Sequence, residues 1–356
     1  MFENKLGQSF ENLGKRIIYS YLATYPQFKP VANCDASELS QRQMYDFLYD
    51  TIEIIYNDLS LINVVDEPDE CYEWWQLNNA RPELILKMQK IEKNIIDFYE
   101  YFIKIGLLGE AADNALIVKK TDMRIAHKTK EKLSRVGLIF DESKDSYIIS
   151  HSKYNELFPA WKLHCSVPKD NIIRSRNMMN FLYGMFGGKQ YTASEMFGKI
   201  CNQEQIAELE SYFLKKGYIT VNNEMNVKYE KEYPKKQKAH MQIYYDWRKK
   251  NQMVFYFKVP QFSTVVKSYE SMDDELKAFV FDRTKTCDGC GYCTQTDKTG
   301  KRPRLALPLE FNGKTLLKCP LFPVIAWNHT DETMIRIVKE LYDFAEDTLY
   351  RNVHKS

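Results

Sequence analysis

Apolar residues recur with the spacing of an α-helix through the first third of the chain. Between Asp46 and Tyr56 they lie three and four positions apart, with acidic residues between them. A second such stripe follows Pro82 and continues to about Leu107, and proline suits a first helical turn because no N–H donor is needed there. We therefore predict an acidic helical region over residues 1–110.

Two later segments share a pattern of helix, glycine and β-hairpin. In the first, a helix ends near Gly137 and a polar turn over 141–145 leads to a strand at 147–149. In the second, helices begin near Thr192 and Asn202, Gly217 ends the latter, and a strand follows near 225–229. These are the parts of a winged helix, so we predict winged-helix-like modules at 111–168 and 169–232.

Residues 228–250 alternate basic with aromatic side chains, a composition that suits stacking with single-stranded nucleic acid. The spacing of Met241, Tyr244, Tyr245 and Arg248 instead favours an amphipathic helix with its rings in the core, and we expect the helix. A strand is predicted at 253–259 and a final helix from about 330. The fold class is mainly α with small β-hairpins (α+β), ending in a C-terminal domain at 233–356.

Composition places the chain among ordinary globular proteins. Its 356 residues suit two or three domains, and 44% hydrophobic with 14% aromatic residues can form buried cores. The sequence contains no run of about 18 apolar residues, the length that a membrane-spanning helix needs. The first residues also lack the apolar core of a secretory signal. We expect a soluble, cytoplasmic protein with no membrane partner.

Charge is distributed unevenly beneath a formal net charge of +2. Residues 35–110 hold 16 acidic and 6 basic residues, a net of −10, and residues 1–34 carry +2, which leaves +10 for 111–356. The second helix of the first module has a net charge of +4, and its basic residues are candidates for contacts with nucleic acid: Arg124, Lys128, Lys130, Lys132 and Arg135. The corresponding helix of the second module has a net charge of −1, which disfavours phosphate binding.

Four of the eight cysteines lie within 33 residues, as Cys287-x-x-Cys290-x-x-Cys293 followed by Cys319-Pro320. Asn312-Gly313 is a strong hairpin-turn signal and would return Cys319 towards the other three. We predict that these four thiolates bind one metal centre. Zn²⁺ fits four sulfurs at tetrahedral spacing, whereas the Cys-x-x-Cys-x-x-Cys run with a distant Cys-Pro is similar to ferredoxin-type ligands of a [4Fe–4S] cluster.

The loop that follows the third cysteine is polar and basic. Lys298, Lys301, Arg302 and Arg304 are candidate ligands of an anion, and the alternative is a solvated spacer. His329 is a possible substitute metal ligand, although a place near the start of the last helix suits it better. No nucleophile, acid–base or nucleotide-binding motif is present, so we favour a protein that is not an enzyme.

The motif Cys287-Asp-Gly-Cys-Gly-Tyr-Cys-Thr-Gln-Thr-Asp-Lys-Thr-Gly-Lys-Arg-Pro303 with Cys319-Pro320 resembles the C-terminal signature of a group of uncharacterised bacterial proteins. The segment Ser152–Phe158 is also similar to a segment of that group. The resemblance implies that the four cysteines act together, and it does not select the metal.

Three hypotheses follow from the sequence. The first is a zinc-stabilised interaction or regulatory protein with a protein partner. The second is a redox protein with an iron–sulfur cluster. The third is a DNA-binding regulator that uses residues 124–136.

Overall fold

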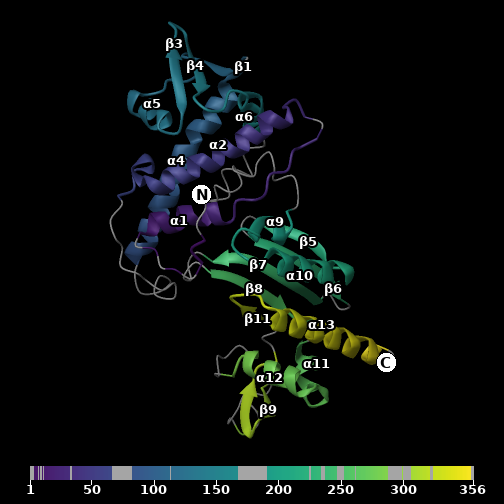
Figure 1. Cartoon of the computed structure of the whole chain (residues 1–356). Helices are drawn as coiled ribbons and strands as arrows, with labels where there is room; N and C mark the ends of the chain where they lie inside the picture. The colour runs from purple at the N-terminus through teal and green to yellow at the C-terminus, as the bar shows by residue number, and fades with distance from the viewer. Residues whose placement is uncertain are drawn as a thin grey trace. The chain divides into compact units, whose positions relative to one another are not determined.

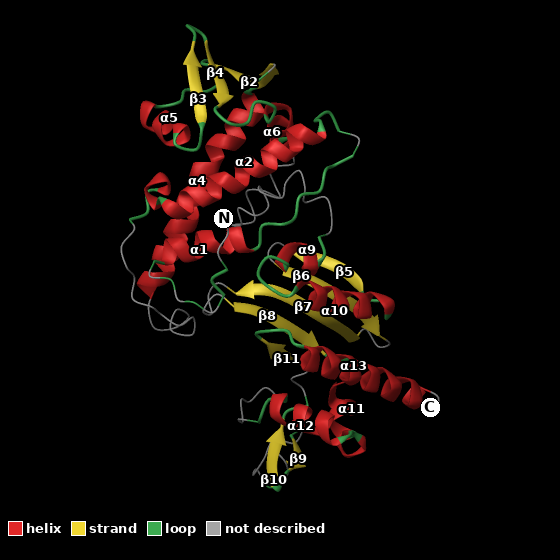
Figure 2. Cartoon of the chain, in the orientation of Figure 1, coloured by secondary structure: helices red, strands yellow, loops and turns green. Residues whose placement is uncertain are grey.

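The computed structural model describes residues 4–6, 8, 10, 12–32, 34–65, 82–112, 114–166, 191–223, 226–233, 237–246, 252–260, 262–287, 299, 306–320 and 324–353. These residues form a mixed α+β fold with small antiparallel sheets (Figure 1, Figure 2). The chain divides into two compact units. Unit 1 comprises Met1–Tyr191 with Asp246–Gln252, and unit 2 comprises Thr192–Tyr245 with Met253–Ser356.

Unit 1 is built on packed helices, which the periodic apolar stripes predicted. They are α1 (Leu13–Ala23), α2 (Glu38–Asn57), the 3-10 helix η1 (Leu59–Ile62), α4 (Pro82–Leu108) and α6 (Phe158–Cys165). Their core is a triangle of rings, in which Phe47 of α2, Phe102 of α4 and Trp161 of α6 lie 5.4–5.6 Å apart between centroids. All three side chains are buried, so the apolar stripe of each helix faces the other two helices.

A four-stranded antiparallel sheet of order β1-β2-β4-β3 completes unit 1. The predicted hairpin is confirmed as β3 (Leu138–Glu142) and β4 (Ser146–His151), preceded by α5 (His127–Ser134), and Gly137 has the expected positive φ. Strands β1 (Glu110–Ala112) and β2 (Ala115–Lys119) were not predicted from the sequence. The described residues between β2 and α5 contain no helix, so the helix–turn–helix half of the first predicted module is not observed there.

The segment after β4 attaches this sheet to helix α2. Asp50 accepts hydrogen bonds from Lys153 Nζ at 2.7 Å and from the Tyr154 hydroxyl at 2.6 Å. The backbone N–H of Glu156 donates to Gln43 at 2.7 Å. The segment Ser152–Phe158, singled out in the sequence by its resemblance, therefore contacts α2 through polar groups.

Unit 2 begins with the predicted helix–turn–helix and hairpin. They are α9 (Ala193–Phe197), α10 (Gln203–Lys215), β5 (Ile219–Asn223) and β6 (Asn226–Tyr233). The capping box of Thr192 and Glu195 starts α9, and the Asn202 side chain caps α10. The hairpin does not end a module at residue 232, because β6 pairs with β7 (Gln237–Asp246) in a five-stranded sheet of order β11-β8-β7-β6-β5.

The expected amphipathic helix around residues 240–248 is wrong, because residues 237–246 form strand β7. The side chains of Ala239, Met241, Ile243 and Tyr245 are buried, and the intervening ones are partly exposed. The same sequence contains both a helical spacing and a strict alternation, and pairing with β6 selects the alternation.

The remaining elements belong to the C-terminal part of unit 2. They are β8 (Gln252–Lys258), α11 (Phe262–Lys267), the 3-10 helix η3 (Tyr269–Ser271), α12 (Asp274–Arg283), β9 (Leu307–Phe311), β10 (Lys314–Lys318), β11 (Val324–Trp327) and α13 (Glu332–Val353). The predicted strand at 253–259 and the predicted last helix are confirmed. Phe213 of α10 contacts Phe257 of β8 and Tyr342 of α13, with ring centroids 6.3 and 4.8 Å apart, so α10, α13 and one face of the sheet share a core.

Gly106 of α4 tests how tightly the helical core of unit 1 is packed. A Cβ added at this position would lie 2.5 Å from Cys165 Sγ and 2.7 Å from Trp161 Cδ1. Gly106→Ala is therefore expected to lower the free energy of unfolding by about 1–3 kcal/mol, despite the higher helix propensity of alanine. Urea unfolding measures the change.

Lys93→Ala in the same helix is the matched control, because Lys93 is exposed and its ion pair with Asp97 lies at the surface. It is expected to change stability by less than about 0.5 kcal/mol. Equal stability of wild type and Gly106→Ala would show that α6 shifts without cost, and would contradict close packing at this contact.

Candidate metal centre

Strands β9 and β10 form the predicted hairpin, so that Cys319, directly after β10, lies near the start of β9. Strands β9 and β10 pair over five residues each, from Leu307 opposite Lys318 to Phe311 opposite Lys314. Asn312 and Gly313 form the turn with φ of 47° and 72°. Two successive residues with positive φ are typical of the type I′ turn, which Asn-Gly favours.

A short antiparallel pairing then brings the two outermost cysteines of the motif together. Thr286 pairs with Lys318 across an isolated bridge. The N–H of Cys287 donates to the carbonyl of Leu317 at 2.8 Å, and the N–H of Cys319 donates to the carbonyl of Lys285 at 2.8 Å. In this register Cys287 and Cys319 are diagonal neighbours on one face of the pairing, with Thr286 and Lys318 on the other.

Lys318 holds this pairing from the opposite face, a role that the sequence did not signal. Its side chain is only 3% exposed. The ammonium donates to the carbonyl of Thr284 at 3.0 Å and to the hydroxyl of Thr286 at 3.3 Å, and it lies 5.0 Å from the centre of the Phe281 ring. Burial lowers the pKa of Lys318, and the nearby Asp282 carboxylate opposes that shift.

The structure describes only part of the predicted site. Cys290 and Cys293 lie outside the described residues, as do Lys298, Lys301, Arg302 and Arg304 of the candidate anion loop. Within the described ranges, no three His, Cys, Asp or Glu side chains gather as ligands of a metal ion. His329 lies at the start of α13, where its ring is 3.2 Å from Asp331.

The cysteines outside the motif have other environments. Cys165 is buried in unit 1, where burial raises the pKa of its thiol well above the usual value and its sulfur contacts the carbonyl of Phe102 at 3.6 Å. Cys34 donates to the carbonyls of Val31 and Ala36. Burial raises the pKa of the Cys201 thiol to about 12, which disfavours the thiolate form that binds metal. Cys71 lies outside the described residues.

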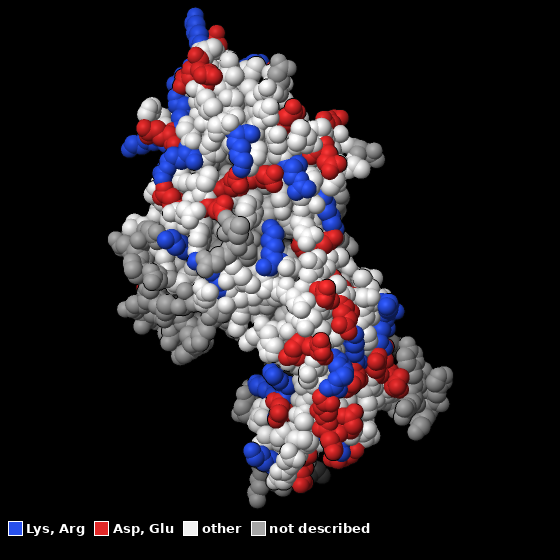
Figure 3. Space-filling view, in the orientation of Figure 1, with Lys and Arg blue, Asp and Glu red and all other residues white. Residues whose placement is uncertain are grey.

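The basic helix α5 contacts acidic and polar groups of its own unit. Lys130 pairs with Glu142 of β3, Arg135 pairs with Asp58, and Lys132 donates to Asn63 at 2.5 Å. Arg124 and Lys128 are exposed. Basic and acidic side chains are mixed around α5 in the view of Figure 3. Three of the five candidate nucleic-acid residues therefore already have partners within the protein.

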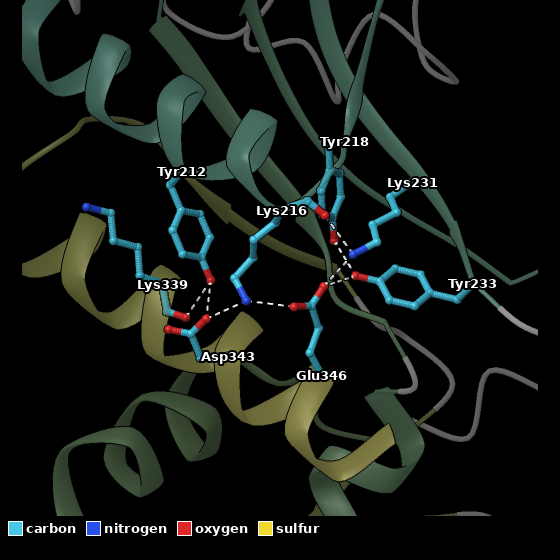
Figure 4. Close-up of polar contacts among 8 residues, drawn as sticks. All are labelled: Tyr212, Lys216, Tyr218, Lys231, Tyr233, Lys339, Asp343 and Glu346. Atoms are coloured by element: carbon cyan, nitrogen blue, oxygen red, sulfur yellow. Dashed lines mark hydrogen bonds and ion pairs between the residues drawn. The ribbon is translucent and has the colours of Figure 1, made fainter. Parts of the chain in front are cut away.

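In the second module, one face of α10 is occupied by α13. Figure 4 shows Tyr212 and Lys216 of α10 directed at α13, where the Tyr212 hydroxyl lies 2.9 Å from the Lys339 carbonyl and from Asp343. Lys216 lies 2.6 Å from both Asp343 and Glu346. This face of α10 cannot act as a recognition helix while α13 covers it.

Glu346 is the centre of this polar contact. Its side chain is 8% exposed and accepts from Lys216 at 2.6 Å, from Lys231 at 3.0 Å and from the Tyr233 hydroxyl at 2.5 Å. Burial by itself would raise the pKa of Glu346, but these three donors outweigh burial and lower it. The carboxylate thus joins α10, β6 and α13.

Glu346→Gln keeps the size of this side chain and removes its charge. Lys231 then loses its counter-ion and Lys216 keeps only Asp343, so we expect a loss of about 3 kcal/mol in the free energy of unfolding of unit 2. Urea unfolding followed by tryptophan fluorescence measures it. Asp343→Asn is the control, because Asp343 is 55% exposed and its ion pair should contribute less than about 1 kcal/mol.

The same variant has a signature in its pH dependence. The pKa of Glu346 in the folded protein is lower than its usual value of 4.5. The ionised carboxylate therefore contributes its full stabilisation of the folded state above about pH 4.5, and this contribution is lost as the pH falls through the folded-state pKa. The stability difference between wild type and Glu346→Gln should therefore shrink in acid. An equal cost of Glu346→Gln and Asp343→Asn at neutral pH would contradict the central role of Glu346.

Comparison of the chain with models of protein families, with curated proteins and with solved structures found no match. Among the described helices none is long and apolar enough to cross a membrane.

Proposed function

We propose that this chain is a cytoplasmic, zinc-stabilised interaction or regulatory protein in which Cys287, Cys290, Cys293 and Cys319 bind one Zn²⁺. The observation that carries the proposal is the backbone pairing of residues 285–287 with 317–319, which puts the first and last cysteines on one face. Both are free thiols and not a disulfide. Four thiolates without an open position are typical of a structural zinc site.

The small size of the hairpin explains why a metal would be needed. A two-stranded sheet such as β9–β10 is marginally stable in water, and much of β10 is exposed. The chain between Cys293 and Cys319 is 25 residues long, so a shared ion would close this loop and add folding free energy. In this proposal the metal fixes the C-terminal part of unit 2 as a surface for a protein partner.

An iron–sulfur cluster at the same residues is the alternative. The Cys-x-x-Cys-x-x-Cys run has the spacing of bacterial cluster ligands and supports this alternative, whereas the 25 residues before Cys319-Pro320 depart from the short last spacing of ferredoxins. A cluster would make the chain an electron carrier, with Lys298, Lys301, Arg302 and Arg304 as candidate contacts for an anionic partner.

The winged-helix interpretation is retained as a proposal for α9, α10 and the β5–β6 hairpin, whose order along the chain supports it. Because α13 contacts one face of α10, we assign this module to protein contacts and not to DNA. For the first module, Lys128 of α5 and Arg124, which precedes α5, are exposed and are the candidate contacts for phosphates.

Cys290→Ser tests the zinc proposal. Loss of one of four ligands should remove the metal and lower the thermal stability of unit 2, because the binding free energy contributes to folding. The chelator-treated wild type should unfold at the same temperature as the variant. Differential scanning calorimetry with metal analysis of the same samples measures both effects.

Cys201→Ser is the matched control, because Cys201 is a half-buried free thiol of unit 2 outside the motif. It should retain the metal. Unchanged thermal unfolding and metal content in Cys290→Ser would rule out a structural four-cysteine site.

A further inference from the structure

Because residues 237–246 form strand β7, the described basic and aromatic side chains of segment 228–250 alternate between the two faces of the five-stranded sheet. On one face, Met241 and Phe257 are buried beneath α10 and α13. On the other face, β6, β7 and β8 present partly or fully exposed side chains: Lys228, Glu230, Glu232, Lys238, His240, Gln242, Tyr256 and Lys258. We call this second set, with Ile219 and Val221 of β5, the open sheet face.

Two rings on adjacent strands of the open sheet face lie parallel. His240 of β7 and Tyr256 of β8 stack at an interplanar angle of 9° with centroids 5.6 Å apart. Both side chains are partly exposed. Parallel rings on an exposed sheet are a stacking platform for planar groups, and each nucleobase has a flat face that can stack on them.

Lysines surround this ring pair. The pKa of His240 is lowered to about 4, mainly by burial and to a smaller extent by the positive charges of Lys228 and Lys258. The His240 ring is therefore neutral at pH 7. Lys258 makes no ion pair with any described residue. On β5, Ile219 and Val221 are 66% and 39% exposed opposite Glu230 and Lys228, and they add apolar surface for base or sugar.

We propose that the open sheet face binds single-stranded nucleic acid, with bases stacked on His240 and Tyr256 and phosphates contacted by Lys228, Lys238 and Lys258. Three lysines against Glu230 and Glu232 leave the face with a net positive charge, and this charge together with the partly exposed rings points to this ligand. A duplex would present only phosphates to the rings, because its bases are already stacked on one another. The proposal is independent of the metal centre.

Glu230 limits the affinity of this face in the free protein. Its carboxylate accepts from Lys238 at 2.8 Å and also pairs with Lys228, and these lysines lower its pKa to about 2. A phosphate must compete with Glu230 for both ammonium groups. Removing the carboxylate therefore should strengthen binding, an outcome that a surface with only a structural role would not give.

The test is fluorescence anisotropy of the whole 356-residue chain with labelled single-stranded oligonucleotides, one of RNA and one of DNA, at low salt. Tyr256→Ala should weaken binding about tenfold through loss of one stacked base, whereas Tyr256→Phe should leave it unchanged. Lys258→Ala should weaken binding and reduce the slope of log K against log salt by about 0.7. Glu230→Gln should bind several-fold more tightly.

Lys314→Ala is the matched control, because Lys314 is an exposed lysine at the β9–β10 turn of the same unit. It should bind like wild type, and thermal unfolding should show that all variants remain folded. No binding at low salt, equal competition by inorganic polyphosphate, or no effect of Glu230→Gln and Lys258→Ala would each overturn the proposal. A dimer of the free chain that Ile219→Glu dissociates would assign the face to a second copy instead.

Discussion

Two backbone hydrogen bonds between residues 285–287 and 317–319 decide the geometry of the C-terminal site. The Asn312-Gly313 turn sets the register of β9 and β10, and that register delivers residues 317–319 to the strand-like end of the Cys287 segment. Lys318 then holds the pairing by hydrogen bonds to Thr284 and Thr286. Because the side chains of a strand alternate, this pairing alone puts Cys287 and Cys319 on one face.

The two units are stabilised by different interactions. Unit 1 depends on packed rings of α2, α4 and α6, with a polar attachment of its sheet through Asp50. In unit 2 the apolar core under the sheet is joined to a buried carboxylate, Glu346, which fixes α13 against α10 and β6. The helix–turn–helix of unit 2, whose second helix has a net charge that already disfavours phosphate binding, thus supports one face of a sheet.

Local signals in the sequence predicted local structure well. The helix from Pro82, the capping box at Thr192 and the hairpin at Asn312-Gly313 each depend on a few neighbouring residues, and each is confirmed. The helix predicted in place of β7 was wrong because Met241 and Tyr245 fit both a helical spacing and the alternation of a strand. The pairing of β7 with β6 and β8, which decides between them, depends on residues brought together only in the fold.

The candidate site was predictable to a similar extent. The return of Cys319 towards Cys287 is confirmed, and the joint site with Cys290 and Cys293 stays a prediction. The role of Lys318 could not be predicted from the sequence, since a lysine in a short strand normally faces solvent. The sequence indicated more unpaired positive charge around α5 than the fold leaves there. The partners of its basic residues, Asp58, Asn63 and Glu142, lie in other parts of unit 1, so the pairing is not visible in the sequence near α5.

The central claim is that the four cysteines hold a structural zinc ion. The most direct measurement is elemental analysis with a visible absorption spectrum of the chain purified without oxygen. We predict about one zinc per chain and no visible band. About four irons per chain with broad visible absorption would contradict the claim in favour of a [4Fe–4S] cluster, and a metal-free, fully folded chain would contradict both.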